Sequence, residues 1–112
     1  MCKYSILAKK PNGMIRYCHE CETYSLLFNN VLMSFDPNGF EGFKNTIYDC
    51  YEHNSEQHFP EHRNVKDITF NTQTKGMSLL FSTNEVATIL SMMQDAELAF
   101  MEISDWGQEH SF

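Results

Sequence analysis

The sequence predicts one α+β domain, in which an N-terminal β-hairpin precedes two units of two strands and a helix. Three observations predict this fold. Apolar and polar residues alternate in short runs, turn-forming residues separate these runs, and two longer segments carry apolar residues at helical spacing. The chain has 112 residues, which is the length of a single domain. Its 42% of apolar and 21% of charged residues are typical of a folded globular protein.

The first segment, residues 1–22, is expected to form the N-terminal hairpin and the turn that follows it. Apolar and polar residues alternate over residues 3–8, and a second strand-like run covers residues 14–18. Between them, Pro-Asn-Gly at residues 11–13 favours a turn with the positive φ angles that a hairpin needs.

Residues 23–53 are expected to form the first strand–strand–helix unit, with a two-residue turn at Asn29 and Asn30 between its strands. Asp36 is placed to cap the helix, and Pro37 fits its first position because a missing N–H costs nothing there. The residues expected to face the core are Tyr24, Leu26, Phe28, Val31, Met33, Phe35, Phe40, Phe43, Ile47, Cys50 and Tyr51.

A polar loop over residues 54–64 is expected before the pattern repeats in a second unit, residues 65–103, and a polar tail, residues 104–112. Ser82 and Glu85 form a capping box at the start of the second helix. The two units have apolar positions in the same order. They are therefore expected to be related by a pseudo-two-fold axis, with one antiparallel sheet and both helices on one face. The expected core residues are Ile68, Phe70, Met77, Leu79, Phe81, Val86, Ile89, Leu90, Met93, Ala96 and Phe100.

The charge of the chain is acidic, with 15 carboxylates against 8 lysines and arginines and a net charge of −7. Nucleic acid is not expected as a partner, because it requires a basic surface. Positive charge gathers in residues 1–16, which contain Lys3, Lys9, Lys10 and Arg16 and no carboxylate, and these cations are expected to be solvated rather than to form a binding patch. No segment has the character of a membrane span or of a signal peptide, which predicts a cytoplasmic protein with no membrane partner.

Cys18 and Cys21 form the one motif with chemical content. Two thiolates at this spacing, in a turn between strands, can hold one edge of a tetrahedral zinc site. Cys2 is the best further ligand, because the first strand should pair with the strand that ends at Cys18, and His19 is a weaker candidate. The alternatives are structural thiols and thiol-redox chemistry. The helix that follows a thioredoxin-like motif is missing here.

Other candidate ligands are expected to have ordinary roles. Cys50 lies on the apolar stripe of the first helix and is expected to act as a small hydrophobe. The histidines at 53, 58 and 62 are expected in a solvated polar segment, with folding over the CxxC turn as the alternative. No catalytic or phosphate-binding motif is present, which disfavours an enzyme.

An apolar strip on the second helix provides a different kind of candidate. Met92, Leu98 and Met101 lie off its best stripe, where they favour either a helix–helix dimer contact or a wider core face. The sequence therefore favours a non-catalytic interaction module, with an unknown protein partner or with self-association. Zinc binding and thiol-redox chemistry through Cys18 and Cys21 are the alternatives.

The run from Tyr17 to Asn30, with the Leu-Met-Ser-Phe strand at 32–35 and the helix start at Phe40 and Phe43, resembles small proteins of the Bacteroidetes that carry a domain of unknown function. A wider set of short bacterial proteins has a similar order of CxxC, strand, turn, strand and helix. Those proteins often have a histidine at the position of Tyr24. The resemblance covers about residues 1–50 and implies a bacterial cytoplasmic protein, without implying an activity.

Overall fold

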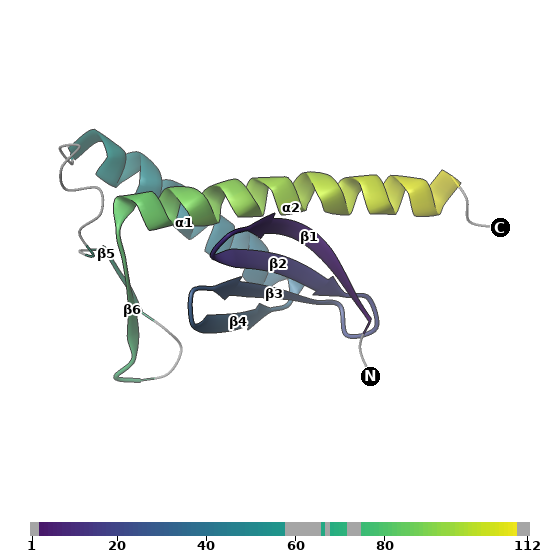
Figure 1. Cartoon of the computed structure of the whole chain (residues 1–112), viewed down its shortest axis with the longest axis horizontal. Coiled ribbons are helices and arrows are strands. Elements are labelled where there is room, and N and C mark those ends of the chain that lie inside the picture. The colour runs from purple at the N-terminus through teal and green to yellow at the C-terminus, as the bar shows by residue number, and fades with distance from the viewer. Residues whose placement is uncertain (1–2, 58–65, 67, 72–74, 110–112) are drawn as a thin grey trace.

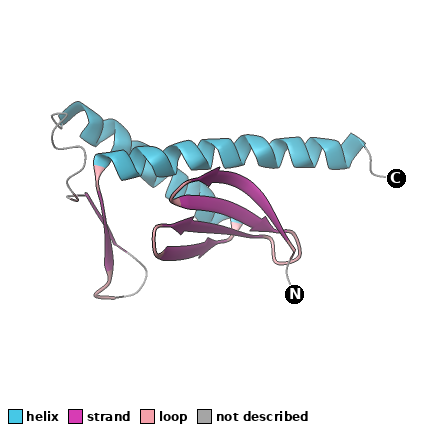
Figure 2. Ribbon diagram, viewed as in Figure 1, coloured by secondary structure: helices cyan, strands magenta, loops and turns pink. Residues whose placement is uncertain are grey.

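The computed structural model describes residues 3–57, 66, 68–71 and 75–109. Strands and helices alternate in the predicted order, which confirms the α+β fold (Figures 1 and 2). The elements are β1 (Tyr4–Lys10), β2 (Gly13–Cys18), β3 (Thr23–Phe28), β4 (Val31–Phe35), α1 (Pro37–Gln57), β5 (Ile68–Asn71), β6 (Ser78–Phe81) and α2 (Thr83–Glu109).

Strands β1 to β4 form one antiparallel sheet in chain order. The alternation expected over residues 3–8 breaks at a register shift between Ile6 and Ala8. Because a β-bulge inserts one extra residue, the side of the sheet on which each residue lies changes there. Tyr4 and Ile6 are exposed, whereas Leu7 and Ala8 are buried.

Both helices cover the same face of this sheet. Helix α2 packs against β1 and β2, and α1 packs against β3 and β4 as well as against α2 (Figure 1). Lys44 of α1 joins the two helices through an ion pair of 2.8 Å with Glu97 of α2, and this hydrogen bond raises the pKa of Lys44. The largest fully buried side chains are Ile15, Leu26, Ile47, Val86, Ile89, Met92 and Met93.

The first hairpin turn contains no positive φ angle, which corrects the expectation for residues 11–13. The described residues with positive φ are Glu22, Asn29 and Gly76. Gly13 is needed for a close approach instead. A Cβ atom there would lie 2.7 Å from the carbonyl oxygen of Leu27 and 3.1 Å from Cε of Met92.

The predicted helix starts are confirmed. The Asp36 carboxylate accepts a hydrogen bond of 2.6 Å from the backbone N–H of Gly39. Ser82 and Glu85 make both bonds of the capping box, at 3.1 Å from the Glu85 N–H to the Ser82 hydroxyl and at 2.9 Å from the Ser82 N–H to the Glu85 carboxylate.

Both helices run beyond the ends expected from their apolar stripes. Helix α1 continues through 54–57, which the sequence placed in a loop, and α2 includes 104–109, which it placed in a polar tail. The end of an apolar stripe does not stop a helix when no breaker follows. Gly107 lies within α2, since a helical glycine costs only about 1 kcal/mol relative to alanine.

The single sheet expected for the two units is wrong, because β5 and β6 form a separate two-stranded sheet. These strands have four residues each and bring two aromatic rings against the core. Phe70 lies 6.1 Å from Phe43, and Phe81 lies 6.1 Å from Phe28, between ring centroids. The short sheet therefore covers one end of the core and does not extend the edge of β1–β4 (Figure 1).

Candidate functional site

The turn that carries the CxxC motif joins β2 to β3. Strand β2 ends at Cys18, and Glu22 closes the turn in the left-handed region, with a φ of 53°. Tyr4 pairs with Cys18, so the beginning of β1 lies beside the motif, as the sequence predicted. Strand β3 follows the turn directly. The helix that follows a thioredoxin-like motif is therefore absent after Cys21, as the sequence predicted.

The two cysteines of the motif have different surroundings. Cys18 is buried, whereas Cys21 is exposed. The backbone N–H of Cys21 donates a hydrogen bond of 3.4 Å to Sγ of Cys18, and the Thr23 hydroxyl donates one of 3.1 Å to the Cys21 carbonyl. These local hydrogen bonds hold the turn, with the Cys18 side chain buried and the Cys21 side chain exposed.

His19 is turned toward strand β1. Its Nε2 atom lies 2.7 Å from the hydroxyl oxygen of Ser5, and its ring meets the edge of Tyr17 at 5.0 Å between centroids. Within 3–57, 66, 68–71 and 75–109, no group of three or more histidine, cysteine, aspartate or glutamate side chains could hold a metal ion. Cys2 lies outside the described residues. Zinc binding through Cys18 and Cys21 therefore stays a prediction.

The remaining candidate ligands lie elsewhere in the fold. Cys50 is partly buried against the core, consistent with a role as a small hydrophobe. His53 is exposed near the end of α1, which Figure 1 shows at the opposite end of the molecule from the CxxC turn. His58 and His62 lie outside the described residues.

Aromatic rings fill the space between the CxxC end of the sheet and the helices. Tyr24 stacks on Phe40 at 4.1 Å between centroids, and Tyr17 meets Phe100 at 5.1 Å. Burial raises the pKa of both tyrosines. The sequence placed Tyr24, Phe40 and Phe100 in the core, but it did not assign Tyr17 to that face.

The face of the sheet opposite the helices is a second candidate site, here named the open face. Its side chains are those that the register places with Ile6 and Arg16 on the side away from the core. Three large apolar side chains on it, Tyr4, Ile6 and Leu32, are 47%, 58% and 58% exposed. The open face consists of Tyr4, Ile6, Lys9, Met14, Arg16, Cys18, Thr23, Ser25, Leu27, Leu32 and Ser34, of which Cys18 and Ser25 are buried.

Arg16 lies in the second strand of the open face. Its Cζ atom is 4.0 Å from the centroid of the Tyr4 ring, which is the distance of a cation–π contact. Its Nε atom is buried and has no hydrogen-bond partner among the described residues. Ile6 and Ser25 are its neighbours across the strands. The guanidinium group is thus held against the open face, with its Nε–H unpaired among the described residues.

The open face was not predicted from the sequence, although the sequence carries a signal for it. Adjacent apolar residues, such as Ile6 with Leu7 and Leu26 with Leu27, occur within single strands. Because successive strand residues point to opposite faces, such pairs make both faces of a sheet apolar.

The apolar strip expected on the second helix is only partly exposed. Met92 is fully buried, so it belongs to a wider core face. Leu98 and Met101 are 62% and 55% exposed, as a contact surface requires. Met77, expected in the core, is exposed because it precedes β6 and does not lie within it.

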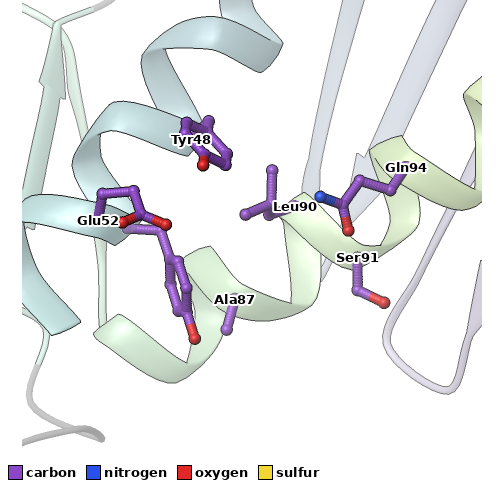
Figure 3. Close-up of a pocket in the computed structure, with 7 residues that line it drawn as sticks. Tyr48, Glu52, Ala87, Leu90, Ser91 and Gln94 are labelled. Carbon is purple, nitrogen blue, oxygen red and sulfur yellow. The ribbon is translucent and has the colours of Figure 1, made fainter.

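A shallow groove of about 270 Å³ lies between α1 and α2 (Figure 3). This volume is slightly below the range of about 300–1,000 Å³ that is usual for small-molecule sites. The groove therefore receives no ligand assignment. Its lining residues are Tyr48, Tyr51, Glu52, Ala87, Leu90, Ser91 and Gln94.

These features define a small α+β domain. Its CxxC turn lies next to a cluster of aromatic rings, and its four-stranded sheet has one face that neither described helix covers. Residues 1–107 match the family of unknown function DUF6686, and the chain belongs to this family. This match confirms the resemblance to a domain-of-unknown-function family, while bacterial origin stays a prediction. No curated protein and no solved structure matches the chain. Neither described helix has the combination of length and apolar character that crossing a membrane demands.

Proposed function

We propose that this domain is a non-catalytic interaction module of the cytoplasm, which binds a protein partner through the open face. The observation that carries this proposal is the exposure of Tyr4, Ile6 and Leu32 on one side of a single sheet. Covering an apolar side chain of this size fully contributes roughly 1.5–3 kcal/mol. An apolar sheet face without a helix on it therefore favours association.

Arg16 supplies the polar anchor of this surface. Its guanidinium group stacks on Tyr4, which limits the side-chain entropy that binding would remove. Arginine and tyrosine are enriched among the residues that dominate binding energy at protein interfaces. A guanidinium group recognises carboxylates through paired hydrogen bonds. With Lys9 on the same face, the chemistry fits an apolar segment that also carries acidic residues.

Capture from cell extract with three forms of the chain tests this function. The forms are the wild type, Ile6→Asp on the open face, and Leu80→Asp on β6 as the matched control. Both substituted leucine and isoleucine side chains are exposed, at 54% and 58%, so both variants should melt with the wild type. We expect a partner held by the wild type and Leu80→Asp to be lost from Ile6→Asp. Equal capture by all three forms would show that the open face is not the interface.

Zinc binding is a second proposal, supported by the hydrogen bond from the Cys21 N–H to Sγ of Cys18. A donated N–H stabilises a thiolate, which is the form that binds zinc. The test is the zinc content of untagged protein purified without chelator. About one zinc per chain or per two chains in the wild type, lost on substitution of both cysteines by serine, supports it. Equal zinc in both forms removes it.

A further inference from the structure

Resting on the proposed function, we infer that the partner of the open face is a second copy of this chain, which contributes the exposed side of its α2. The contact places Leu98 and Met101 of one copy against Tyr4, Ile6 and Leu32 of the other. It brings the acidic residues of that helix to Arg16 and Lys9.

The helix side of this contact is amphipathic and faces away from its own sheet. Phe100 points inward, because its ring meets those of Tyr17 and Tyr24 at 5.1 and 5.8 Å. Leu98 lies two residues earlier, about 200° around the helix, and is 62% exposed. Asp95 and Glu102 are exposed as well, whereas Glu97 is already ion-paired with Lys44 of its own chain. An apolar strip flanked by carboxylates matches an apolar face that carries cations.

The distribution of charge selects helix-on-sheet over other pairings. Residues 1–16 contain four cations and no carboxylate, and residues 76–112 contain no lysine or arginine. Within the described part of the chain, none of the four cations forms an ion pair with a carboxylate. The ion pairs present use Lys44 and Lys66. Two open faces would oppose positive charges, and two α2 helices would oppose negative ones. The carboxylates within residues 76–112 are Glu85, Asp95, Glu97, Glu102, Asp105 and Glu109.

The contact is head-to-tail, because the open face and the exposed side of α2 point in opposite directions on each copy. Figure 1 shows the C-terminal end of α2 projecting past the four-stranded sheet, where it can reach a neighbouring copy. Each copy gives its helix to one neighbour and receives the helix of another, so the assembly is an open chain of copies and does not close at two. Its length should therefore increase with the protein concentration.

Sedimentation equilibrium of four forms tests the arrangement. Ile6→Asp removes the sheet side, Leu98→Lys removes the helix side, and Leu80→Asp and Leu80→Lys are matched controls on β6. We expect the wild type and both controls to self-associate alike. Each interface variant alone should weaken self-association by about tenfold or more. An equimolar mixture of the two interface variants should form dimers and nothing larger, because the intact helix of one meets the intact sheet of the other and neither variant can extend the chain further.

Other outcomes overturn the arrangement. Wild-type self-association in Ile6→Asp, with loss in Leu98→Lys, would indicate helix-on-helix contact, and the reverse would indicate sheet-on-sheet contact. Added salt should weaken a contact of opposite charges and strengthen one of like charges. A wild type that stays monomeric at every concentration ends the inference. The proposed function would then still stand if Ile6→Asp loses a different protein partner in the capture experiment.

Discussion

The two faces of the four-stranded sheet carry similar side chains in opposite surroundings. Ile15 and Leu26 on the inner face are 0% exposed, whereas Ile6 and Leu32 on the open face are each 58% exposed. Packing against α1 and α2 explains why the inner residues are apolar. It does not explain the outer ones, because an exposed apolar side chain adds little to folding. The apolar residues of the open face therefore need a reason other than folding, and the proposed binding surface supplies one.

The largest expected effect is a difference in the free energy of unfolding between two variants, one with an inner-face isoleucine and one with an open-face isoleucine replaced by alanine. Ile15→Ala should lower the free energy of unfolding by about 2–5 kcal/mol, since it removes a fully buried side chain. Ile6→Ala should change it by less than about 0.5 kcal/mol. Urea denaturation of both variants measures the difference. A similar loss for both would mean that the open face supports the fold itself.

The next effect concerns how closely α2 approaches the sheet. Gly13→Ala should cost about 1–3 kcal/mol, because its Cβ would lie 2.7 Å from a backbone oxygen and 3.1 Å from Met92. Gly42→Ala is the control, since a Cβ there meets nothing within 4 Å. As a helical glycine, Gly42 should yield roughly 0.5–1 kcal/mol of added stability on substitution. Thermal unfolding of both variants measures the two changes in stability. If Gly13→Ala and Gly42→Ala change the stability in the same direction, the close approach at Gly13 is contradicted.

A smaller contrast lies within the CxxC turn. Cys18→Ser should lower the free energy of unfolding by about 1–3 kcal/mol, because it places a hydroxyl where a thiol is 1% exposed. Cys21→Ser should change it by less than about 0.5 kcal/mol, since Cys21 is exposed. Chemical denaturation after purification without chelator measures both. Equal losses from the two variants would instead support a zinc site that holds them together.

Local chemistry made most of the fold predictable. The Asp36 cap, the Ser82–Glu85 box and the two-residue turn at Asn29 each follow from residues that stabilise a backbone bond or angle nearby. The separate β5–β6 sheet was not predictable, because alternation shows which residues are buried but not which strand lies next to which. The helix ends were missed because an apolar stripe reports packing, and a helix continues beyond its packed part.

The site was less predictable than the fold. The sequence identified Cys18 and Cys21, but their unequal burial depends on how the turn sits on the sheet. Arg16 received no role because its cation–π contact with Tyr4 requires the register of β1 and β2. The exposure of Ile6 depends on which face the helices cover. That choice is made by Phe40 and Phe100, far along the chain.

The smallest expected effect on stability at neutral pH comes from replacing the tyrosines of the inner face, because their contribution changes only at alkaline pH. Burial raises the pKa of Tyr17 and Tyr24 above the ordinary value of 10.0. A raised pKa in the folded state means that their stabilising contribution is complete below about pH 10 and is lost as the pH rises through the folded-state values. Tyr17→Phe and Tyr24→Phe should therefore flatten the alkaline loss of stability, which urea denaturation between pH 8 and about pH 11 measures. If both variants lose stability as steeply as the wild type, the inner face does not exclude water around these hydroxyls. The contrast between the two faces would then be smaller than their exposed areas indicate.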